Sequence, residues 1–131
     1  MPNLTSEQAS KIANSLQGIA KAIGEYRKEN YIKMSPIQIV SIENLQEQIL
    51  QQADKLYTES AILVMDDIQN SLATIEKVTA EIQETIKGLQ DIQKTIDIAT
   101  SVLNLGAAIL SKNPQSIGKS IVELVKNVKE I

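Results

Sequence analysis

The sequence predicts an all-α fold, an elongated antiparallel bundle of four or five helices with coiled-coil-like seams. The apolar residues are almost entirely aliphatic, with 20 Ile, 12 Leu, 7 Val and 11 Ala against three tyrosines and no Phe or Trp. Glycine and proline number only 5 and 3 in 131 residues, too few for the many turns of an all-β fold. The third observation is a heptad-like apolar spacing in the second half of the chain. At this length we expect one helical domain over residues 1–131.

The first two helices have clear start signals. Thr5 and Gln8 fit a capping box, which predicts a helix over about 5–32. Ser35 followed by Pro36 pairs a capping side chain with proline at the first helical position, which predicts a second helix over about 36–65.

The third predicted helix covers about 67–112 and carries the heptad pattern. Its apolar residues, from Ile68 to Leu110, take twelve steps to cover 42 residues, a mean spacing of 3.5. Two places could hide a turn in the proline-free stretch between Pro36 and Pro114: residues 66–71, and Gly88 acting as a C-terminal cap. Unbroken, this helix would be ~69 Å long and would outrun its neighbours. Some of its apolar stripe would then lie uncovered, which favours an oligomer, although the partner helix could belong to the same chain or to another. The residues expected in the interaction seam are Ile75, Ile82, Ile86, Leu89, Ile96 and Leu103.

A last helix is predicted over about 114–130. Asn113 and Pro114 stop one helix and start the next. The following apolar residues again alternate spacings of four and three, ending at Ile131.

The missing residue types exclude most catalytic and metal-binding chemistry. Histidine and cysteine are both absent, so the chain has no Ser-His-Asp triad, no thiol nucleophile, no ordinary zinc ligand set and no disulfide. The carboxylates are most simply solvated helix faces, because di-metal bundles need Glu-x-x-His motifs. We therefore expect no enzyme, with no catalytic residue, metal or cofactor.

The charge distribution bears on the kind of partner. The net charge of −3 divides into +2 over residues 1–42, −7 over 43–97 and +2 over 98–131. An acidic middle argues against docking on a nucleic-acid backbone. The function favoured by the sequence is a non-enzymatic helical interaction module, which binds a partner protein or a second copy of itself through its aliphatic heptad seams.

The uncharged segment 98–111 leads to an alternative function. Its 14 residues would span ~21 Å as a helix, short of the ~30 Å hydrocarbon core of a bilayer. The segment is therefore either a helix buried in the bundle or part of a hairpin that enters a membrane interface. The residues of this candidate membrane segment are Ile98, Val102, Leu103, Leu105, Ile109 and Leu110.

A resemblance to a known class of proteins also favours the membrane-active alternative. Long glutamine-rich amphipathic helices lead into the Gly/Ala-bearing apolar helix Ile98–Leu110 and then the Asn113-Pro114 turn. Over about residues 68–128 this pattern resembles parts of the α-helical pore-forming toxins. The resemblance implies a membrane-active protein of pore-forming or cell-death type, and no functional residue is carried over.

The start of the sequence favours a cytoplasmic location. No basic segment followed by an apolar one precedes the first predicted helix, and no apolar run is long enough to span a bilayer.

Overall fold

The chain folds into an all-α bundle, as the sequence predicts. In the computed structural model, residues 5–58, 68–89, 91–111 and 114–129 are described. They contain the five α-helices α1 (Ser6–Asn30), α2 (Pro36–Thr58), α3 (Ile68–Gly88), α4 (Ile92–Leu110) and α5 (Pro114–Lys129), and a short 3-10 helix, η1 (Tyr31–Lys33).

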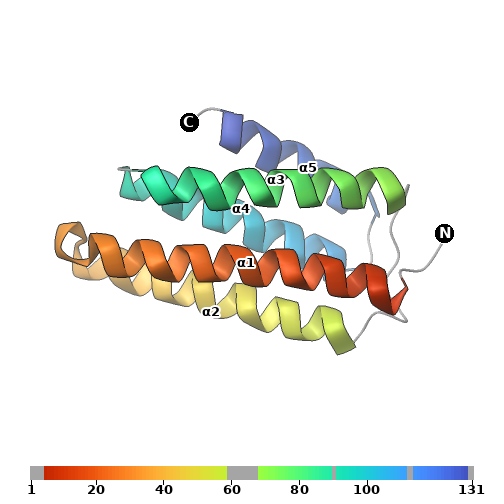
Figure 1. Cartoon of the computed structure of the whole chain (residues 1–131), viewed down its shortest axis with the longest axis horizontal. Helices are drawn as coiled ribbons and strands as arrows, with labels where there is room; N and C mark the ends of the chain where they lie inside the picture. Colours follow the sequence, from red (N-terminus) through yellow and green to blue (C-terminus); the bar gives the residue numbers. More distant parts are fainter. Residues whose placement is uncertain (1–4, 59–67, 90, 112–113, 130–131) are drawn as a thin grey trace.

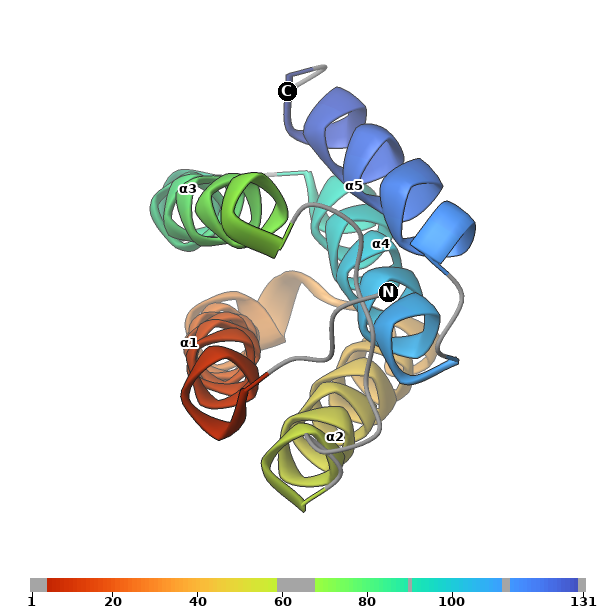
Figure 2. The same ribbon diagram turned by 90° about the vertical axis from the view of Figure 1, so that its right-hand side faces the viewer.

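Successive helices run in opposite directions along one common axis (Figure 1). α1 packs against α2 and α3, and α4 packs against α2 and α5. Seen end-on, α5 lies on the far side of α4 from α2 and also contacts α3 (Figure 2). The antiparallel arrangement therefore holds, with α5 added to the outside of the four other helices.

The predicted helix starts at Thr5 and Ser35 are confirmed. The Thr5 hydroxyl accepts from the Gln8 amide at 3.1 Å, and the Gln8 side chain accepts from the Thr5 amide at 2.9 Å. Ser35 makes the same reciprocal pair with Gln38, at 3.2 and 2.9 Å. Each capping box satisfies two backbone amides that have no partner within the helix.

The helix predicted over 67–112 is wrong as a single element. α3 ends at Gly88, and α4 begins after Asp91, whose carboxylate accepts from the Lys94 amide at 3.3 Å. Gly88 does not have the left-handed backbone of the expected C-terminal cap. The new start comes instead from the Asp91 side chain, because aspartate is a strong N-cap.

The break near residues 66–71 lies partly outside the described residues. α2 ends at Thr58 and α3 begins at Ile68, so the two helices are separate. The end of the helix predicted over 36–65 falls on residues that the structure does not describe. With both breaks present, the bundle has five helices, the larger of the two numbers that the sequence allowed.

The core is aliphatic and runs the length of the bundle. Its fully buried large side chains come from α1, α2 and α3 and are joined by those of α4, with Ile117 and Leu124 anchoring α5. Tyr26 is the aromatic residue in this cluster. The ion pair between Arg27 and Glu43, at 2.8 Å, ties α1 to α2 at the bundle surface.

Three glycines each receive a glutamine side chain from a neighbouring helix. A Cβ atom at Gly18 would lie 2.5 Å from Gln83 Nε2, and one at Gly24 would lie 2.6 Å from Gln46 Nε2. At Gly106 the Cβ would overlap Gln52 Oε1 and lie 2.6 Å from its Cδ. Gln52 Nε2 donates to the Leu103 carbonyl at 2.8 Å, which joins α2 to α4. These glycines are therefore contact points between helices rather than helix breaks.

Replacing Gly106 with alanine is expected to forfeit most of the stability that the better helix propensity of alanine would add. The new methyl displaces the Gln52 amide, which is the far end of a flexible side chain, and breaks its hydrogen bond to the Leu103 carbonyl, at a cost of about 0.5–1.5 kcal/mol. Alanine returns up to about 1 kcal/mol through propensity. Urea unfolding measures the net change.

The matched control is Gly118→Ala in α5, where nothing lies within 4 Å of the added Cβ. This variant should gain up to about 1 kcal/mol when unfolding is measured at low protein concentration. Adding Gln52→Ala to Gly106→Ala should recover part of the loss, with a coupling free energy of about 0.5 kcal/mol or more. A Gly106→Ala variant as stable as Gly118→Ala would contradict the close contact.

Candidate interaction surface

The predicted seam is core and not surface. Ile75, Ile82 and Ile86 on α3 are buried, at 1%, 0% and 0% exposure. The other three predicted seam residues, Leu89, Ile96 and Leu103, are partly buried and pack against the same core. Because the chain turns between α3 and α4, the stripe that was expected to lie uncovered is covered within the molecule.

The candidate membrane segment also lies in the core. Ile98, Val102, Leu105 and Ile109 are 0–1% exposed, and the remaining two of the six residues, Leu103 and Leu110, pack partly buried against them. None of the described helices is long and apolar enough to cross a membrane. In this conformation the segment serves as the inner face of α4.

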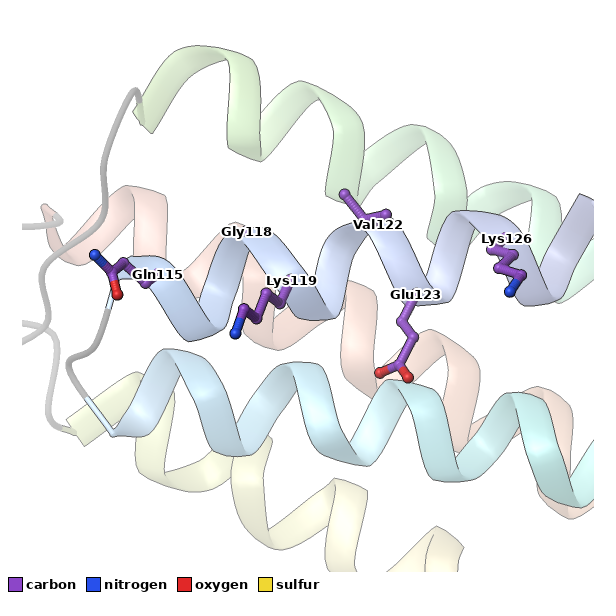
Figure 3. Close-up of a pocket in the computed structure, with 6 residues that line it drawn as sticks. All are labelled: Gln115, Gly118, Lys119, Val122, Glu123 and Lys126. Carbon is purple, nitrogen blue, oxygen red and sulfur yellow. The ribbon is translucent and has the colours of Figure 1, made fainter.

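The outer face of α5 presents a shallow, open surface, here called the α5 groove, whose lining residues all lie on this one helix. Figure 3 shows Val122 on the side of α5 nearer α3, with Lys119 and Glu123 on the side nearer α4. The described residues that line this α5 groove are Gln115, Gly118, Lys119, Val122, Glu123 and Lys126.

α5 is held to the bundle by its other face. Ile117 and Leu124 are 2% and 1% exposed, and the Asn127 side-chain amide donates to the Ser101 hydroxyl of α4. Pro114 opens the helix, as the Asn113-Pro114 pair predicts, although Asn113 lies outside the described residues. These anchors fix which side of α5 faces outward, so the α5 groove is presented by a helix with a defined rotation.

The outer face combines a small apolar contact with alternating charge. Val122 is 68% exposed, and a Cβ at Gly118 would meet nothing within 4 Å. A glycine one turn before an exposed valine lets a second helix approach closely, and the lysine stems extend the apolar contact. Lys119, Glu123 and Lys126 then present positive, negative and positive charge along one side.

The predicted seam and the candidate membrane segment both lie outside this surface, which the sequence does not predict. Val122 lies off the apolar stripe of the last helix, which runs through Ile117, Ile121 and Leu124. One signal was available: Gly118 and Val122 are four residues apart, so they share a second face.

The described residues contain no group of three or more acidic, histidine or cysteine side chains that could hold a metal ion. Comparison with known proteins finds no matching family, no similar curated protein and no similar solved structure.

Proposed function

We propose that the chain is a non-enzymatic helical interaction module that binds a second copy of itself through the α5 groove. The observation that carries the proposal is the exposed Gly118–Val122 face, on a helix whose opposite face is anchored in the core. A partner helix of another protein would use the same face, and it is the second form of the proposal. The coiled-coil character predicted for the seams stays a prediction.

The charge order on α5 favours a second copy. In an antiparallel pair of α5 helices centred near Val122, Lys119 of each copy lies opposite Glu123 of the other. Such a two-fold arrangement is self-complementary, because one surface supplies both partners of each ion pair. The valines meet at the centre, where water is excluded most completely.

Charge reversal provides a sharp test of this pairing. Lys119→Glu and Glu123→Lys should each weaken self-association several-fold, because each places like charges opposite one another. The double variant should restore the affinity, since it exchanges the two signs. Val122→Asp should abolish association. Light scattering across a concentration series measures the mass against the 14.4 kDa of one chain.

Two results would contradict the proposal in this form. One is a strict monomer at every concentration. The other is an oligomer whose mass is unchanged by Val122→Asp and by both single charge reversals. Lys77→Glu on α3 is the matched control, because Lys77 is exposed and outside the α5 groove, and it should have no effect.

The membrane-active alternative is not favoured by the position of residues 98–111. Four of its six candidate residues are almost completely buried, so a membrane would reach them only after α4 left the bundle. A cytoplasmic location belongs to the proposal as well, and imaging a fluorescent fusion in the host cell would test it.

A further inference from the structure

Exposed large apolar side chains gather at one end of the bundle. Ile32 is 98% exposed and Ile37 79%, with Tyr31 at 55% and Val40 at 54%. These four residues, here called the apolar tip, are four of the seven exposed large hydrophobic residues in the part of the chain that the structure describes. They lie within ten residues of one another, on η1 and the first two turns of α2. The connection between α1 and α2 projects beyond the ends of α3, α4 and α5 (Figure 1).

The fold holds the apolar tip outward. α2 turns Ile42, Ile49 and Leu56 into the core, and at 100° per residue Ile37 and Val40 fall on the opposite side. Met34 is buried beneath the turn at 7% exposure, and its amide donates to the Tyr31 carbonyl at 3.2 Å. The exposed residues are therefore not positions that a small rotation of α2 could bury.

The same end of the bundle is positively charged. This end consists of the last turns of α1, α3 and α5, the first turns of α2 and α4, and η1. Together with the N-cap of α4 and the two acids that pair with Arg27 and Lys87, its described residues include seven basic and four acidic side chains, a balance of +3. Among the described residues, the terminal helical turns at the opposite end carry one basic and one acidic side chain, in a chain of net charge −3. The seven basic residues are Arg27, Lys28, Lys33, Lys87, Lys94, Lys126 and Lys129, and the four acidic ones are Glu29, Glu43, Glu84 and Asp91.

We propose that this end of the bundle docks on an anionic membrane surface, with Ile32 and Ile37 entering the headgroup layer. Aliphatic side chains that protrude singly gain by leaving water for the acyl boundary, and tyrosine is favoured at the interface. Lys28 precedes the apolar tip in sequence and Lys33 lies between Ile32 and Ile37. Both lysines are exposed, so their ammonium groups can reach lipid phosphates. This mode of binding is peripheral and leaves residues 98–111 in the core.

The shape of the tip favours a lipid surface over a protein partner. A side chain that is 98% exposed has almost no neighbours, so Ile32 stands alone and does not line a groove. A fluid interface accommodates such separate protrusions, whereas protein hot spots occupy well-packed pockets. Binding of a protein at this tip is the competing outcome, and the test separates the two.

The experiment is co-sedimentation of the full chain with vesicles of phosphatidylcholine, alone or mixed with phosphatidylserine. We expect binding to the mixed vesicles that falls as salt is raised. Ile32→Ser with Ile37→Ser should reduce the partition coefficient by about tenfold or more. Lys28→Gln with Lys33→Gln should reduce it roughly fivefold per lysine, on the anionic vesicles only.

Matched controls keep the result specific. Leu50→Ser removes an exposed aliphatic residue from the middle of α2, and Lys77→Gln removes a lysine from the middle of α3. Neither should change vesicle binding, and circular dichroism should show every variant folded, because all these positions are exposed. The self-association proposal and the membrane proposal can fail separately, because the variants that test self-association leave the apolar tip intact.

The proposal is overturned if wild-type protein fails to sediment with anionic vesicles, or if the tip variants bind them as well as wild type does. It is also overturned if the tip variants change the oligomeric mass in light scattering and leave vesicle binding unchanged. That last result would assign the apolar tip to a protein contact.

Discussion

Val102→Asp is expected to destabilise the bundle by at least about 4 kcal/mol, close to the whole stability of an ordinary domain. Val102 is 0% exposed and lies in the core with Ile98 and Leu105, so an aspartate there would be a buried charge among aliphatic side chains. Thermal unfolding followed by circular dichroism measures the effect, which should be a fall in the midpoint of roughly 10–20 °C or a chain that is unfolded throughout.

Val122→Asp is the matched control, the same substitution at a valine that is 68% exposed. It should change stability by no more than about 0.5 kcal/mol when measured at concentrations where the chain is monomeric. Equal effects at the two valines would mean that α4 does not form the core. This comparison tests directly whether segment 98–111 is structural.

The second large effect is expected at Ile82, a residue of the predicted seam. Ile82→Ala should cost about 2–5 kcal/mol, because Ile82 is fully buried and its removal leaves a cavity between α3 and the rest of the core. Urea unfolding should show a lower midpoint with an unchanged m-value.

Ile37→Ala is the control of the same type, at a residue that is 79% exposed. It should change the free energy of unfolding by no more than about 0.5 kcal/mol. If Ile82 were an intermolecular seam residue, its substitution would instead make stability depend less on protein concentration. Loss of stability at all concentrations supports its place in the core of one chain.

Local signals in the sequence predicted the class and most of the helix starts. Thr5 and Ser35 begin helices because their side chains can satisfy backbone amides three residues away, an interaction within one turn that requires no tertiary contact. Pro114 begins α5 for a similarly local reason. The aliphatic periodicity then identified side chains that are buried, among them Ile75, Ile82 and Ile86.

The turn between α3 and α4 was harder to predict because the apolar spacing continues through it. Ile86, Leu89, Ile92 and Ile96 remain three or four residues apart, and each is buried or partly buried. Periodicity therefore shows no interruption where the chain reverses. The prediction of an uncovered seam followed from the single long helix, and it fails for the same reason.

The two exposed surfaces depend on which helix covers which face, information that a single stripe does not contain. Val122, Ile37 and Val40 lie off the dominant stripes of their helices, and sequence alone treats such residues as incidental. The structure distinguishes them by exposure and by grouping. The glutamine contacts on Gly18, Gly24 and Gly106 are also tertiary, since each joins residues on different helices.

The reversal of the chain between α3 and α4 can be measured directly with two spin labels. The sequence has no cysteine, so Ala73→Cys on α3 and Ala107→Cys on α4, both exposed, give the only two labelling sites. A second double-cysteine variant, labelled at Ala73 and Lys87, provides a reference distance, because both positions lie on α3 and are ~21 Å apart along the helix axis. In the five-helix bundle the Ala73–Ala107 distance should be below about 30 Å, since α3 and α4 both contact α5 and packed helix axes lie about 8–10 Å apart. A distance near ~51 Å, the length of 34 residues in one continuous helix, would contradict the bundle.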